Sequence, residues 1–171
     1  MSTGRIVTLT ILCLILPAGA FAQGYTQGDK TLQLSMNGAS DKDFDNTIFS
    51  ITGELGYFAT PNIQAALRQG VRFSDIEGGG STTNASTVGA VDYNFDMGRL
   101  WPFGGVSVGY VYGGGVADSW EMGLEGGASY FVNTTTFILG RIEYQWFLDN
   151  NSDGGFEDGQ WVYTIGIGFR W

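Results

Sequence analysis

Residues 160–171, QWVYTIGIGFRW, decide the fold class. Large apolar side chains occupy every second position from Trp161 to Trp171, and smaller or polar residues stand between them. Successive side chains of a β-strand point to opposite sides of a sheet. This strict period of two therefore predicts a strand with one apolar and one polar face.

The same alternation recurs seven more times toward the N-terminus. The predicted strands lie within residues 31–37, 49–57, 63–73, 87–95, 105–112, 119–132 and 138–148. Short connections at 59–62, 96–101 and 133–136 alternate with longer polar ones at 39–45, 74–84, 113–118 and 149–159. An even number of strands with alternating short and long connections is typical of membrane barrels. The sequence thus predicts an all-β fold, an eight-stranded antiparallel up-and-down transmembrane β-barrel.

The first 22 residues have the features of an export signal. Arg5 precedes an apolar run from Ile6 to Leu16, and Ala20-Phe21-Ala22 supplies the small residues that a signal peptidase requires. The apolar run is too short for a membrane-spanning helix, which needs about 20 residues. We therefore expect residues 1–22 to be a cleaved signal peptide and residues 23–171 to be the barrel.

The composition argues against several classes of function. A formal net charge of −9 would repel the phosphates of nucleic acid. The chain contains no histidine, which is the commonest general base of enzymes and a common metal ligand. A serine nucleophile without a base is inert. We therefore expect a protein that is not an enzyme and that needs no cofactor.

Charged residues inside the predicted strands all share the polar face with small residues. The lumen of an eight-stranded barrel is just wide enough to be filled by side chains. Charges confined there need partners, because an isolated buried charge is costly. The sequence therefore predicts a paired charge network that closes the lumen, formed by Glu54, Arg68, Arg72, Asp92, Glu121, Glu125, Arg141, Glu143 and Arg170.

Aromatic residues gather near both ends of the predicted strands. One set lies near the short connections: Tyr57, Trp101, Phe103, Tyr130, Phe137, Phe169 and Trp171. The other lies near the long connections: Phe49, Phe73, Tyr112, Trp120, Trp146, Phe147 and Trp161. Two aromatic girdles on an outer face mark the two interfaces of a membrane. The alternative is a soluble, lipocalin-like ligand-binding barrel whose aromatic residues fill an internal cavity.

The chain ends in Thr164-x-Gly166-x-x-Phe169-x-Trp171, which resembles the C-terminal signal read by the barrel assembly machinery of Gram-negative bacteria. With its leader, strand pattern and charged lumen, the chain resembles the small outer-membrane barrels of the OmpX and OmpA transmembrane-domain type, often labelled a porin family. The resemblance implies Sec-type export to the outer membrane of a Gram-negative bacterium. It also implies outer-membrane lipid, lipopolysaccharide and the assembly machinery as partners of a monomer. Gly166, Phe169 and Trp171 would carry the assembly signal.

Enzymes are also found among barrels of this size. The lipid A palmitoyltransferase and deacylase barrels resemble this architecture, but each relies on an essential histidine. Because this chain has none, neither activity can be transferred to it.

The long connections are acidic. Asp149, Asn151 and Asp153 alternate like the ligands in the first half of a calcium loop, but the twelfth position holds Gln160 instead of a bidentate glutamate. They are weak metal candidates, and a flexible hairpin loop is the simpler interpretation. We expect a closed barrel that serves envelope structure and surface interaction through acidic loops, with divalent cations as candidate ligands there. A narrow porin-like or hydrophobic passage for small molecules is the alternative function.

Overall fold

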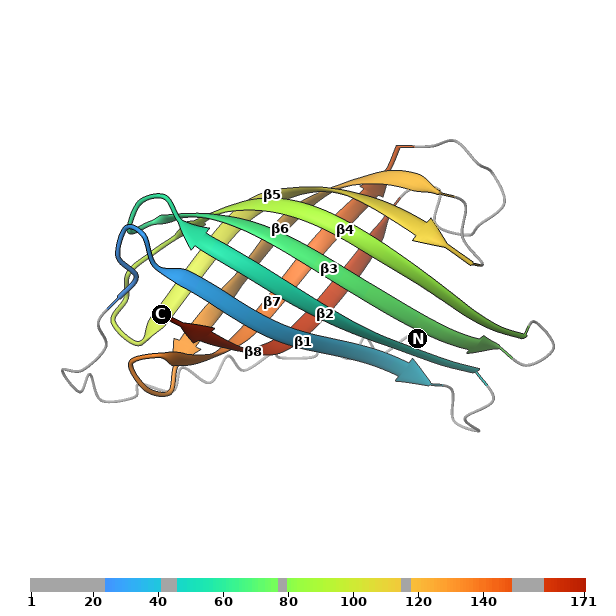
Figure 1. Ribbon diagram of the computed structural model, residues 1–171, viewed down its shortest axis with the longest axis horizontal. Helices are drawn as coiled ribbons and strands as arrows, with labels where there is room; N and C mark the ends of the chain where they lie inside the picture. The colour runs from blue at the N-terminus through green and yellow to red at the C-terminus, as the bar shows by residue number, and fades with distance from the viewer. Residues whose placement is uncertain (1–23, 41–45, 77–79, 115–117, 149–158) are drawn as a thin grey trace, which may run out of the picture.

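The architecture is a closed barrel of antiparallel strands (Figure 1). The structure is a computed structural model that describes residues 24–40, 46–76, 80–114, 118–148 and 159–171. The predicted signal peptide lies outside these residues. Neighbouring strands follow the chain order around the barrel: β1 (Lys30–Ser40), β2 (Asn46–Phe58), β3 (Ile63–Ile76), β4 (Gly80–Asn94), β5 (Leu100–Gly113), β6 (Ser119–Phe131), β7 (Thr136–Phe147) and β8 (Gln160–Arg170).

Strand β8 closes the barrel by pairing with β1. Thr31 lies opposite Arg170, and Met36 lies opposite Ile165, in an antiparallel ladder. Closure leaves the sheet without an exposed edge strand. The prediction of an eight-stranded up-and-down barrel is confirmed. Among the described residues, no helix is long and apolar enough to cross a membrane.

The two faces of the wall differ in chemistry. Large apolar side chains such as Leu55, Leu67 and Ile165 are exposed on the outside. Polar side chains such as Gln33 and Ser129 are buried on the inside. A soluble ligand-binding barrel has the opposite arrangement, with its large apolar residues around the internal cavity. The observed orientation therefore argues against the lipocalin-like alternative.

Several strands extend further than the alternation predicts. β4 begins at Gly80 and stays paired with β3 as far as Ile76, although the sequence predicts a loop over 74–84. Ser74 and Thr82 are partners in this ladder, which depends on backbone groups that every residue carries. Hydrophobic alternation marks only the part of a strand that has an apolar outer face. The polar, hydrogen-bonded ends continue beyond it.

The connection between β4 and β5 is tighter than predicted. Leu100 and Trp101 belong to β5 rather than to a turn over 96–101. Met97 N–H donates to the Leu100 carbonyl at 3.2 Å, and Gly98 has a φ of +76°, which glycine adopts without strain. Trp101 therefore takes part in the alternation of β5, on its lumen side. We call this end of the barrel, with its short connections, the tight-turn end.

Candidate functional site

A network of buried ion pairs crosses the middle of the lumen. Arg68 on β3 donates through Nε to Glu54 Oε2 on β2 at 2.6 Å. Its two terminal nitrogens donate to the carboxylate of Glu125 on β6 at 2.6 and 2.5 Å. Arg141 on β7 donates to the same Glu54 oxygen at 2.9 Å. We call these four residues and Asp92 on β4, whose Oδ2 lies 3.7 Å from Arg68 Nη2, the central network.

Strand register and side-chain length together build this network. Glu54 and Arg68 are partners on adjacent strands, and both face the lumen. Arg68 then reaches across the lumen to Glu125, and the planar guanidinium matches the carboxylate with two parallel hydrogen bonds. The side chains of Arg68, Glu54, Arg141 and Glu125 are 5%, 5%, 4% and 0% exposed. The charges are therefore paired in a region that water does not reach freely.

Three other predicted lumen charges are Arg72, Glu121 and Glu143, and Arg72 and Glu121 lie toward the opposite end of the barrel, which we call the long-loop end. Glu143 is buried and accepts a hydrogen bond from Ser107 at 2.5 Å. Glu121 is buried within electrostatic range of Glu143. Arg72 is half-buried on β3, one lumen-facing position beyond Gly70. These residues give the lumen a polar lining beside the central network, in which Glu143 is the ladder partner of Glu125.

Arg170 lies at the tight-turn end. As the last residue of β8, it places its guanidinium 3.6 Å from Asp29 and donates to the carbonyl oxygens of Gly24 and, at 2.7 Å, Thr134. The sequence predicts instead that it lies near Arg141 and pairs with Glu54, Glu125 or Glu143. The position at the end of a strand explains the difference, because Arg170 reaches the mouth of the lumen and the turns around it.

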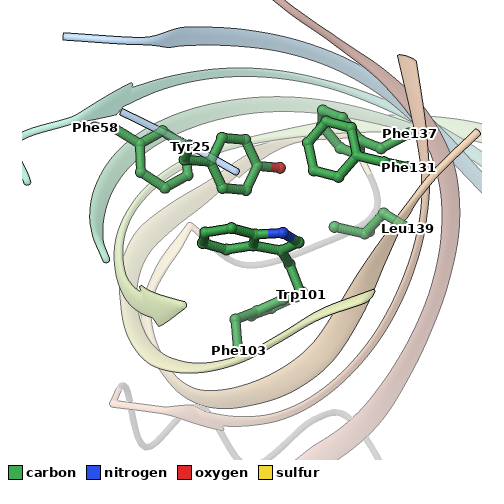
Figure 2. Close-up of a cluster of buried hydrophobic side chains, with 7 residues drawn as sticks. All are labelled: Tyr25, Phe58, Trp101, Phe103, Phe131, Phe137 and Leu139. Atoms are coloured by element: carbon green, nitrogen blue, oxygen red, sulfur yellow. The ribbon is translucent and has the colours of Figure 1, made fainter. Parts of the chain in front are cut away.

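Apolar side chains fill the lumen at the tight-turn end (Figure 2). Tyr25, from the segment before β1, stacks on Phe58 with ring centroids 3.8 Å apart. It also meets Trp101 and Phe131 edge-on, at 5.0 and 5.2 Å. We call the buried set the aromatic cluster: Tyr25, Phe58, Trp101, Phe103, Phe131, Phe137 and Leu139.

Hydrogen bonds hold the segment that carries Tyr25 against the wall. Gly28 N–H donates to the Phe58 carbonyl at 2.8 Å, and Phe58 N–H donates to the Asp29 carbonyl at 2.9 Å. The Asp29 carboxylate accepts from Thr26 N–H at 2.8 Å. Gly28 has a φ of +94°, which lets the chain turn there. The resulting turn directs Tyr25 into the barrel.

The predicted outer girdle at this end is wrong for three residues. Trp101, Phe103 and Phe137 are 1%, 8% and 2% exposed, and they face the lumen. Tyr57, Phe169 and Trp171 do lie on the outer wall. The alternation along β5 could have predicted this orientation. Trp101 and Phe103 stand at odd positions, whereas the outward-facing residues of β5, such as Val106, stand at even ones.

The remaining predicted sites fall into two groups. Phe169 and Trp171, from the predicted assembly signal, face outward at the tight-turn end, and Gly166 lies on the lumen side of β8. The metal candidates Asp149, Asn151 and Asp153 lie outside the described residues. Within the described ranges, no group of three or more acidic side chains is placed to hold a metal ion.

Similarity to known proteins appears at the level of structure. No protein-family model and no curated protein sequence matches the chain. The outer membrane protein OprG from Pseudomonas aeruginosa is similar, with 17% identity and a TM-score of 0.63 over 88% of this chain and 99% of that one. The fold is that of a small outer-membrane β-barrel.

Two further structures share this small outer-membrane barrel fold. The N-terminal β-barrel domain of OprF from Pseudomonas aeruginosa is 17% identical, with a TM-score of 0.59 over 85% of this chain and 98% of that one. Neisserial surface protein A is 16% identical, with a TM-score of 0.54 over 83% of this chain and 94% of that one. Within this fold, the present chain fills its lumen at two levels, with the central network and the aromatic cluster.

The hydroxyl of Tyr25 gives a first prediction for this barrel. It hydrogen-bonds to Ser129, and burial raises the pKa of the phenol far above its ordinary value. Tyr25→Phe keeps the ring and loses one hydrogen bond, so we expect the free energy of unfolding to fall by about 0.5–1.5 kcal/mol. Urea unfolding followed by tryptophan fluorescence measures the change. Tyr163→Phe on the outer wall is the matched control, and an equal loss there would contradict a specific role for the buried hydroxyl.

Proposed function

We propose that this protein is a non-enzymatic outer-membrane barrel with a closed lumen, which serves envelope structure and surface interaction through the acidic connections of its long-loop end. One observation carries the proposal: a wall with outward-facing apolar side chains surrounds a lumen crossed by buried, mutually paired charges. The wall explains where the protein resides, and the filled lumen explains why the loops rather than a pore perform its role.

The outer wall suits the hydrocarbon core of a membrane. Every strand contributes exposed large apolar side chains, for example Leu32, Leu55, Leu67, Val91, Val106, Leu124, Ile142 and Ile165. So extensive an apolar surface would promote aggregation in water, whereas a closed barrel satisfies its backbone hydrogen bonds within a bilayer. Exposed aromatic side chains stand toward both rims, including Trp171 at the tight-turn end and Trp161 at the long-loop end.

The outer membrane of a Gram-negative bacterium is the membrane that these features favour. The export signal supports secretion by the Sec route, and the C-terminal pattern ending in Phe169 and Trp171 supports insertion by the barrel assembly machinery. Lipopolysaccharide and divalent cations are the partners that acidic loops would meet at the cell surface. The fold shared with OprG and with the OprF barrel domain is consistent with this location.

The lumen disfavours a passage for solutes. A crossing molecule would have to separate Arg68 from both Glu54 and Glu125, and it would also have to displace Tyr25. Each step exposes buried charge or opens packed aromatic contacts. Chemistry in the lumen is disfavoured on the same grounds, because the guanidinium and carboxylate groups of its centre already bind one another.

An electrophoretic experiment tests the membrane barrel. The purified protein in detergent is run on an SDS gel with and without boiling, and we expect the unboiled sample to migrate differently because the closed barrel keeps its compact shape. A sample denatured in urea before loading should match the boiled one. Identical mobility of all samples, together with solubility in plain buffer, would overturn the proposal.

A further inference from the structure

The central network contains more acidic than basic groups. Its three carboxyl groups belong to Glu54, Asp92 and Glu125, and its two guanidinium groups belong to Arg68 and Arg141. None of these side chains is more than 5% exposed. A surplus negative charge in such a place is costly. Either a proton or a bound cation must balance it.

The contacts distinguish Asp92 from the other two carboxyl groups. Glu54 accepts from both arginines, at 2.6 and 2.9 Å, and Glu125 accepts two hydrogen bonds from Arg68. The nearest guanidinium nitrogen to Asp92 is 3.7 Å away, which is too far for a hydrogen bond. The carboxyl group of Asp92 instead lies within hydrogen-bonding distance of the carboxyl group of Glu125. Two carboxylates so close cannot both be ionised without strong repulsion.

The second oxygen of Asp92 faces a small cavity. Asp92 Oδ1, Gln33 Nε2 and Asn94 Nδ2 are buried without a hydrogen-bond partner, and all three residues line this cavity. It has a volume of about 10 Å³, which is about the least that can hold one water molecule. On the other side, Asp92 lies directly over Gly105, where a Cβ atom would overlap with its Oδ1.

Groups from most of the strands surround Asp92. β1 presents the Gln33 amide, and β5 presents Gly105. The charged or titratable groups that face it come from β2, β3, β6, β7 and the segment before β1: Glu54, Arg68, Glu125, Arg141 and Tyr25.

We propose that Asp92 is a proton-binding site of the folded barrel: at neutral pH its carboxyl group is protonated, donates to Glu125, and faces one water molecule held by Gln33 and Asn94. The two remaining carboxylates then balance the two guanidinium groups. The water accepts from the two amide groups and donates to Asp92 Oδ1, so that each of the three buried atoms gains a partner. Sodium would also balance the charge, but the two N–H donors that line the cavity are unfavourable neighbours for a cation.

Asp92→Asn provides the test, because asparagine has the same shape and can still donate to Glu125. An aspartate in the unfolded chain ionises near pH 4, whereas the folded protein keeps the proton, so folding binds a proton above about pH 4. The contribution of Asp92 to the stability of the native barrel therefore falls as the pH rises. The quantity to measure is the unfolding equilibrium constant of the native barrel divided by that of the Asp92→Asn variant. We expect this ratio to increase by about tenfold per pH unit between about pH 5 and pH 7.

Matched variants sharpen this measurement. Asp29→Asn removes a carboxylate that pairs with Arg170 at the mouth, and it should leave the pH dependence of the native barrel in place. The stabilities are compared in sodium, potassium and choline chloride at equal ionic strength. A ratio that does not vary with pH would show that Asp92 is ionised, and a ratio that follows the identity of the cation would assign the balancing charge to a metal ion. Either result overturns the proposal.

Infrared spectroscopy of the native barrel gives a second test that needs no variant. A protonated carboxyl group has a C=O stretching band that a carboxylate lacks. We expect such a band at neutral pH, and we expect it to shift when the aspartate carboxyl carbons are labelled with ¹³C. Absence of any aspartate-sensitive carboxylic acid band in the folded protein would contradict the proposal, whether or not Asp92→Asn folds.

Discussion

Replacing Glu54 with alanine is expected to lower the free energy of unfolding by about 3–5 kcal/mol, which is the range for breaking one side of a buried ion pair. Glu54 Oε2 accepts from Arg68 at 2.6 Å and from Arg141 at 2.9 Å, so one substitution removes a partner from both. Arg141 loses most, because its next carboxylate oxygen, on Glu125, is 3.9 Å away. Urea unfolding of the barrel in detergent or lipid, followed by tryptophan fluorescence, measures the loss.

The neighbouring carboxyl group limits how far the network can adjust. Release of a proton from Asp92 would restore the balance of charge, but the ion pair of Asp92 is with Arg68, at 3.7 Å, whereas Arg141 is the residue that loses its hydrogen bond. We therefore expect ionisation of Asp92 to offset only part of the stability lost with the Glu54 carboxylate. Asp118→Ala is the matched control, since this exposed carboxylate should contribute less than about 1 kcal/mol. A loss of similar size in both variants would show that water reaches the lumen and solvates its charges.

The period of two was sufficient to predict the barrel. A wall with lipid on one side and a narrow lumen on the other forces each residue to one of two environments, so Leu55 and Glu54 differ in chemistry as their positions require. The same pattern predicts which strands are neighbours, because short connections join antiparallel strands. It could not predict that Glu54 binds two arginines, since Arg141 lies on a strand far away in the sequence and reaches Glu54 across the lumen.

The burial of Tyr25 could not be predicted from the period of two. This residue precedes the first alternating stretch, and its burial depends on partners from β2, β5, β6 and β7 that come together only when the barrel closes. One local feature is consistent with its position: Gly24 lies against the Trp101 ring, where a Cβ atom would overlap with it. The sequence predicts a polar inner face along each whole strand, and this expectation places Trp101, Phe103 and Phe137 of the aromatic cluster on the outer wall. The residues of the cluster are buried together with Tyr25 and do not face water.

The two filled levels of the lumen act in series, and this leads to a prediction about ion conductance. The central network crosses the middle of the barrel, and the aromatic cluster fills the tight-turn end. Ions need a continuous water path, so opening either level alone leaves the other closed. We expect no steady channels in planar bilayers from the native barrel, from a network variant (Glu54→Ser, Arg68→Ser, Glu125→Ser and Arg141→Ser), or from a cluster variant (Tyr25→Ala and Trp101→Ala).

The combination of the two sets of substitutions should behave differently. Small residues at both levels would let water fill the lumen from end to end, so we expect steady conductance only from the combined variant. Each variant must first show the heat-dependent gel mobility of a folded barrel. Conductance of the network variant alone would show that Tyr25 and its neighbours do not seal the tight-turn end. Large, steady channels in the native barrel would contradict the closed lumen and favour the passage of small molecules as the function, because the paired charges would then have to separate under ordinary conditions.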